Sequence, residues 1–140
     1  MKNINFYEGQ RKIAYMWFGF SAILFLLIFL QYILGKFENK NQEAWGWFFG
    51  LILPNLTLML TVFVTDTNNK DDTSEIRMFY YRLTAGLSIF YFMSISLIIL
   101  LQPMIQKPII QLMSESNLFL VPIQGVVSGS IGLFFVKKEK

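Results

Sequence analysis

The chain has 140 residues, of which 54% are hydrophobic and 15% are charged, and its formal net charge is +3. Soluble domains carry about 25% charged residues, so this composition argues against a soluble globular protein. The chain contains no cysteine and no histidine, which excludes disulfides, thiolate nucleophiles and the commonest general base and metal ligand.

Four long apolar stretches dominate the sequence, and they cover residues 13–34, 44–64, 83–101 and 118–136. None of them contains Asp, Glu, Lys, Arg or His. A bilayer core about 30 Å thick is crossed by about 20 helical residues that rise about 1.5 Å each. The sequence therefore predicts an all-α integral membrane protein, with a single four-helix transmembrane domain over residues 1–140.

Basic residues concentrate in the N-terminal arm, between the second and third stretches, and at the C-terminal end. The positive-inside rule then predicts that both termini lie in the cytoplasm. Abundant Lys, Asn, Ile and Phe suit an AT-rich bacterial genome, which indicates the bacterial inner membrane. Trp17, Trp45 and Trp47 lie near the ends of the apolar stretches and are interpreted as anchors at the membrane surface.

The first stretch is too long for the apolar region of a signal peptide, which covers about 7–15 residues. We interpret it as a retained membrane span. Phe and Leu side chains surround it on all sides, which favours a helix that faces lipid.

The second stretch carries small and polar residues at spacings of three and four, which place them on one helical face. Such a face lets helix backbones approach closely. It is interpreted either as a packing seam inside the bundle or as a polar wall that faces water. Its candidate residues are Gly46, Gly50, Pro54, Thr57 and Thr61.

Two amides stand out within the apolar stretches. Asn55 lies at the middle of the second stretch and points more than 90° away from the Gly/Thr face, so it needs a different partner. Gln124 lies in the fourth stretch and needs a partner as well, because an unpaired amide in hydrocarbon costs several kcal/mol. Pro54 also leaves the carbonyl of Gly50 without its intrahelical donor.

The connection at residues 66–81 is the most polar part of the chain. It does not fit a calcium-binding loop, because Asp71 stands where glycine is needed and Arg77 stands where glutamate is needed. We interpret it as a solvated cytoplasmic connector, and as the surface on which a cytoplasmic regulator would act.

The connection at residues 102–117 contains two prolines, and apolar and polar residues alternate after Pro108 with helical spacing. This pattern predicts a short amphipathic helix in the membrane interface. A re-entrant loop or a lid over a pore mouth is the alternative.

The fourth stretch carries a second face of small and polar residues, and the opposite side of this helix is apolar. The face is interpreted either as a surface packed against the second stretch or as the lining of a central pore. Its members are Gln124, Gly125, Ser128, Gly129 and Gly132.

No ionisable residue lies within the apolar stretches, which argues against a membrane enzyme and against an ion-coupled transporter. The sequence predicts no catalytic residue, no cofactor, no metal site and no nucleic-acid partner. Two functions remain. The first is a homo-oligomeric channel or pore with an uncharged lining; the second is a non-catalytic structural or assembly subunit of a larger membrane complex. We favour the first, because two small-residue faces exceed what one bundle needs. The expected partners are the lipid bilayer and either further copies of the chain or another membrane protein.

Overall fold

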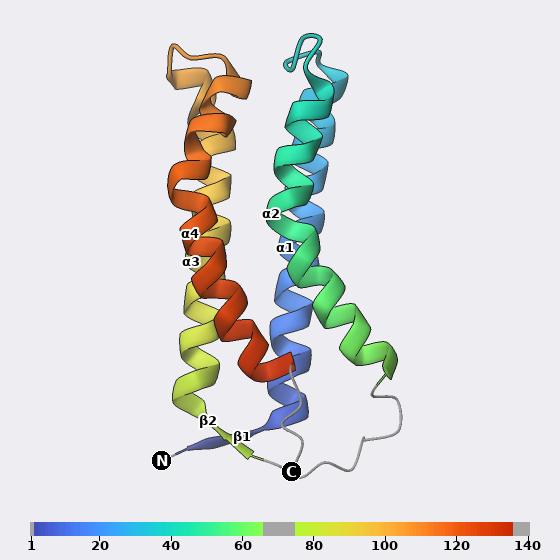
Figure 1. The fold of residues 1–140 in the computed structure, drawn as a ribbon, viewed down its shortest axis with the longest axis vertical. Helices are drawn as coiled ribbons and strands as arrows, with labels where there is room; N and C mark the ends of the chain where they lie inside the picture. Colours follow the sequence, from blue (N-terminus) through green and yellow to red (C-terminus); the bar gives the residue numbers. More distant parts are fainter. Residues whose placement is uncertain (1, 66–74, 136–140) are drawn as a thin grey trace.

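The computed structural model describes residues 2–65 and 75–135, and four long helices make up most of this part of the chain (Figure 1). Each helix is long and apolar enough to cross a membrane, which confirms the predicted helices. They are α1 (Phe6–Ile33), α2 (Asn41–Thr65), α3 (Met78–Leu101) and α4 (Ile109–Phe135).

The helices form two hairpins that lie side by side. Helix α1 is followed by the antiparallel α2, and α3 by the antiparallel α4 (Figure 1). Across the boundary between the hairpins, α1 packs against α3 and α2 packs against α4. Helices α2 and α4 therefore share one side of the bundle. Figure 1 shows the second half of α2, which contains Pro54, leaning away from α1.

Helix α1 begins at Phe6, well before the apolar stretch that predicted it. The side chain of Asn5 caps it, because Oδ1 accepts hydrogen bonds from the backbone N–H groups of Tyr7 and Glu8 at 3.0 and 3.4 Å. The first turns are polar, so hydrophobicity alone could not locate this end of the helix.

Two short strands join the starts of the two hairpins, and the sequence analysis did not predict them. Strand β1 (Asn3–Asn5) pairs antiparallel with β2 (Glu75–Arg77), and Ile4 lies opposite Ile76. Asn3 Nδ2 also donates to Glu75 Oε2 at 2.8 Å. Residues 66–74, which make up most of the predicted regulator surface, lie outside the described residues. The rest of that surface forms β2 and the start of α3.

The predicted short interfacial helix is wrong as a separate element. Only a 3₁₀ turn, η1 (Gln102–Met104), lies between α3 and Pro108, and α4 then runs without a break from Ile109. Met113 packs into the core while Glu115 is exposed and forms an ion pair with Lys107 at 2.7 Å. The predicted amphipathicity is therefore present, but these residues are the first turns of α4.

Large aromatic side chains fill the middle of the bundle. Trp17 is 0% exposed and packs against Tyr91 and Phe92, so it is a core residue rather than the surface anchor that the sequence suggested. Its indole Nε1 donates to Ser88 Oγ at 3.0 Å. Trp47 is likewise buried and donates to Ser116 Oγ at 3.1 Å.

Candidate interaction face on helices α2 and α4

The Gly/Thr face of α2 points away from the bundle. Its members Gly46, Gly50, Pro54, Thr57 and Thr61 are all exposed. The opposite side of the same helix is buried and contributes Phe48, Leu51, Ile52, Asn55 and Met59 to the interior.

Helix α4 shows the same division. Gly125 and Gly129 are exposed, and Gln124, Ser128 and Gly132 are half-buried. The apolar side that the sequence identified is fully inside, since Val127, Ile131 and Phe134 are each 0% exposed. We call the ten small and polar residues of the two helices the α2–α4 face; they are Gly46, Gly50, Pro54, Thr57, Thr61, Gln124, Gly125, Ser128, Gly129 and Gly132.

The glycines of the α2–α4 face have open space in front of them. A Cβ atom added at Gly46, Gly50, Gly125, Gly129 or Gly132 would meet no atom within 4 Å apart from its chain neighbours and the backbone of its own helix. Close backbone approach at a glycine requires the opposite, an atom in the place of the missing side chain. Within a single chain these glycines are therefore not points of close backbone approach, although α2 and α4 do pack against each other.

A hydrogen bond joins the two halves of the face. Gln124 Nε2 donates to the carbonyl of Gly50 at 3.0 Å and lies 3.4 Å from that of Leu51. Pro54 has no N–H, so the Gly50 carbonyl lacks the donor that a regular helix would supply. Gln124 fills that vacancy from the neighbouring helix, and Tyr91 Oη donates to the Leu51 carbonyl at 3.0 Å.

No protein-family model, no curated protein and no solved structure matches this chain.

The chemistry of the α2–α4 face is that of uncharged hydroxyls, backbone carbonyls and open glycines. Thr61 Oγ1 donates to the carbonyl of Thr57 at 2.8 Å, one turn earlier in the same helix. Over residues 2–65 and 75–135, no three His, Cys, Asp or Glu side chains gather as metal ligands would. The face is therefore suited to contact with another helix or with water.

Asn55 stands apart from the other candidate residues. It is 2% exposed and points into the bundle, as its position on the helix predicted. Its Nδ2 has no hydrogen-bond partner, and neither does the buried hydroxyl of Ser21 on α1. These are two of three buried side-chain atoms that the described residues leave without a hydrogen-bond partner, and the third is Gln31 Oε1.

Several buried polar residues that join the helices could not be identified from the sequence, and three of them illustrate the reason. Tyr91, Ser88 and Ser116 each bond to a group on a different helix. A tyrosine or a serine in an apolar stretch signals that some partner is needed, but it does not say which helix supplies that partner.

Proposed function

We propose that this chain is an integral membrane protein that crosses the bilayer four times, and that it assembles with further copies of itself through the α2–α4 face to enclose an uncharged pore. One observation carries the proposal: each of two neighbouring helices presents a row of small and polar residues on its outer side, among exposed apolar residues such as Leu53 and Val126, while a different row of large apolar residues is buried. In a lone chain this outward face would meet lipid.

Lipid is a poor neighbour for such a face. Membrane helices instead associate through small residues, where backbones approach closely and packing contacts are gained. The open space in front of Gly125 and Gly129 is suited to a helix of a second copy. The number of such positions on two adjacent helices favours an assembly of several copies over a monomer.

The assembly would conduct through its uncharged interior. Ser128 and Thr57 supply hydroxyls toward the centre, and no acidic or basic side chain belongs to the α2–α4 face. Such a pore selects weakly between ions and closes by dewetting of its apolar constrictions. With the basic ends of the hairpins on the inner side, both termini lie in the cytoplasm, and the membrane is the inner membrane of a bacterium.

A second function has one specific observation in its favour. Gln124, the residue of the α2–α4 face with the strongest hydrogen-bonding side chain, is already used by the Gly50 carbonyl within the chain. A face that has satisfied its own polar groups is suited to dry packing. In that case it docks a different membrane protein, and the chain is a non-catalytic assembly subunit.

Conductance across a planar bilayer tests the pore. The purified chain is reconstituted as the natural sequence, as Gly129→Leu, and as the matched control Gly86→Leu. Gly86 is also exposed on its helix, with no atom within 4 Å of an added Cβ, but it belongs to α3. The pore proposal expects Gly129→Leu to abolish conductance and Gly86→Leu to retain it. Undiminished conductance in Gly129→Leu would contradict the proposal, whereas a silent natural chain that copurifies with a different protein would support the assembly subunit.

A further inference from the structure

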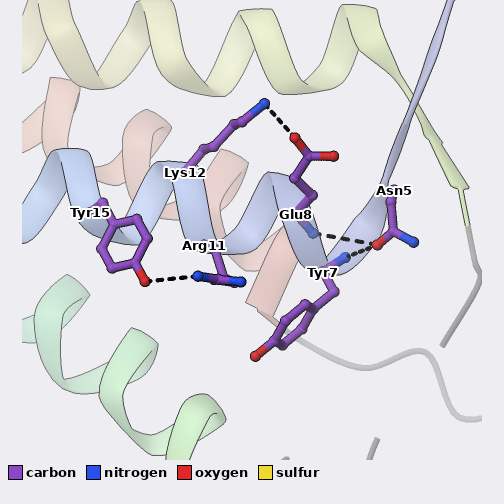
Figure 2. A pocket seen from close by; sticks show the side chains of 6 residues that line it. All are labelled: Asn5, Tyr7, Glu8, Arg11, Lys12 and Tyr15. Atoms are coloured by element: carbon purple, nitrogen blue, oxygen red, sulfur yellow. Dashed lines mark hydrogen bonds and ion pairs between the residues drawn. The ribbon is translucent and has the colours of Figure 1, made fainter. Parts of the chain in front are cut away.

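A cluster of basic and aromatic side chains lines an open surface cavity at the start of α1, and the lining includes no residue of the α2–α4 face (Figure 2). The cavity measures about 600 Å³ and is lined by residues from the last position of β1 and the first turns of α1. We call these residues the Arg11 cluster; they are Asn5, Tyr7, Glu8, Arg11, Lys12 and Tyr15.

The guanidinium group of Arg11 is held between two tyrosines. Its Cζ lies 5.8 Å from the ring centre of Tyr7 and 5.6 Å from that of Tyr15, one turn away on either side. Its Nη2 also donates to Tyr15 Oη at 3.1 Å, as Figure 2 shows. Cation–π attraction and this hydrogen bond fix the orientation of the planar group. A ligand that binds it therefore has less side-chain entropy to freeze.

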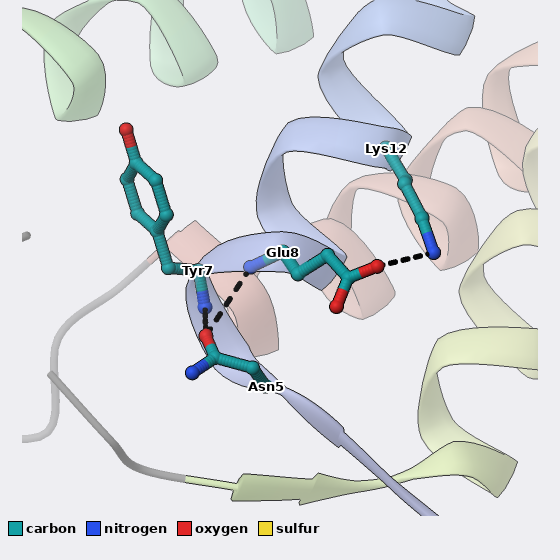
Figure 3. Close-up of polar contacts among 4 residues, drawn as sticks. All are labelled: Asn5, Tyr7, Glu8 and Lys12. Carbon is teal, nitrogen blue, oxygen red and sulfur yellow. Dashed lines mark hydrogen bonds and ion pairs between the residues drawn. The ribbon is translucent and has the colours of Figure 1, made fainter.

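Arg11 forms no ion pair with an acidic side chain among the described residues, although the nearby Glu8 carboxylate attracts it electrostatically. Glu8, the acidic member of the cluster, forms its ion pair with Lys12 at 2.6 Å (Figure 3). Asn5 Oδ1 accepts from the backbone N–H groups of Tyr7 and Glu8, so these amides are engaged too. Arg11 thus remains as the cation of the cluster that is open to an external anion.

The cluster lies where the chain passes from polar to apolar. The apolar stretch begins at residue 13, and Tyr15 is 65% exposed, as expected for an aromatic residue at the headgroup level of a membrane. Further along the same side of α1, Gly19 and Ala22 are exposed. A Cβ added at Gly19 would meet nothing within 4 Å. An apolar chain can therefore extend from the cluster along the helix surface.

We infer that the Arg11 cluster binds the phosphate group of an anionic phospholipid, with an acyl chain along Gly19 and Ala22. A guanidinium group offers two parallel N–H donors that match two phosphate oxygens. Free phosphate shares this chemistry, but the open apolar path beside the cluster favours a lipid. The inference rests on the membrane insertion proposed above and is independent of the pore.

Native mass spectrometry of the full chain in mild detergent tests the site. The chain is titrated with phosphatidylglycerol and with phosphatidylcholine of the same acyl composition. We expect the natural chain to prefer phosphatidylglycerol by about tenfold, the range of one well-placed charge-assisted contact. Arg11→Gln should lose this preference, while the matched control Arg82→Gln should keep it, because Arg82 is an exposed arginine near the start of α3 and does not belong to the cluster. Equal binding of the two lipids by the natural chain, or an unchanged preference in Arg11→Gln, would overturn the inference.

Two further measurements separate the other sources of the signal. Arg11→Lys keeps the positive charge but loses the two parallel N–H donors. We therefore expect its preference for phosphatidylglycerol to lie between those of the natural chain and Arg11→Gln. If Arg11→Lys kept the full preference, a general positive surface would explain the binding, and the site would be overturned. If inorganic phosphate bound the chain as tightly as phosphatidylglycerol does, the ligand of the site would be a soluble anion, and the lipid inference would be overturned. If the chain stayed in solution without detergent, membrane insertion itself would be contradicted. A failure of the lipid comparisons alone would contradict only the lipid site.

Discussion

The side-chain amide of Gln124 on α4 donates to the backbone carbonyl of Gly50 on α2, with 3.0 Å between nitrogen and oxygen. That carbonyl is the one that Pro54 leaves without a partner in its own helix. A proline in one helix is thus matched by an amide in its neighbour. The bond holds α2 and α4 together at the centre of the α2–α4 face.

Replacement of Gln124 by Leu should lower the free energy of unfolding by about 1 kcal/mol, because the Gly50 carbonyl then loses its donor in a low-dielectric setting. The loss should shrink in the background of Pro54→Ala, since residue 54 then supplies its own N–H to that carbonyl. Unfolding by a denaturing detergent measures all four members of this double-mutant cycle.

Gln111→Leu is the matched control for this cycle, because Gln111 is exposed on the same helix and bonds to the exposed Glu115. It should change stability by only a few tenths of a kcal/mol. An equal loss for Gln124→Leu with and without Pro54 would mean that the amide acts in some other way.

Ser88→Ala should destabilise the bundle more than the loss of one small side chain would suggest. Its hydroxyl accepts from the fully buried indole of Trp17, and an unsatisfied buried donor costs about 1–3 kcal/mol. The double variant Trp17→Phe with Ser88→Ala should cost less than the sum of the two single changes. Strict additivity in thermal unfolding would argue that this hydrogen bond contributes nothing.

Asn55→Leu should be neutral or stabilising by about 1 kcal/mol in the isolated chain, because it replaces a buried donor without a partner by an apolar group. The same comparison applies to Ser21→Ala on α1, whose hydroxyl is also unsatisfied. A strong loss of stability in Asn55→Leu would contradict this account, because it would show that Nδ2 is satisfied inside the bundle.

A disulfide engineered between Asn3→Cys and Arg77→Cys should form readily under mild oxidation. These residues are opposite one another in the β1–β2 pair, where Cα separations of about 4.5–5.5 Å suit a disulfide. The natural chain has no cysteine, so a shift in electrophoretic mobility reports this pair alone. Asn3→Cys with Gln111→Cys is the negative control, and absence of a bond in the first pair would contradict the pairing of the two hairpins.

The number and type of the long helices could be predicted from the sequence because uninterrupted apolar runs have few other structures open to them. Their starting points could not. Glu8 and Lys12 belong to α1 but not to its apolar run. Pro108 directly precedes α4, and residues 109–117 look like an independent amphipathic helix in the sequence although they are its first turns. Strands of three residues such as β1 leave no periodic pattern long enough to recognise.

For the α2–α4 face, the sequence predicted which residues share a side of each helix but not the direction in which that side points. The residues of each half could be grouped from helical spacing alone, since spacing fixes which side chains share a side. Whether that side turns inward or outward depends on the neighbouring helices, and small residues suit close packing in either direction. The pairing of Gln124 with Gly50 was hidden for the same reason, because a single helix does not reveal its neighbour.

The mass of the purified complex in mild detergent tests the central claim most directly, and native mass spectrometry measures it. If the α2–α4 face joins copies of the chain, the natural sequence should form a closed assembly of at least three copies. Gly129→Leu should dissociate it, and Gly86→Leu should leave it intact. A monomeric natural chain, or one copy bound to a different protein, would contradict assembly through this face and with it the proposed pore.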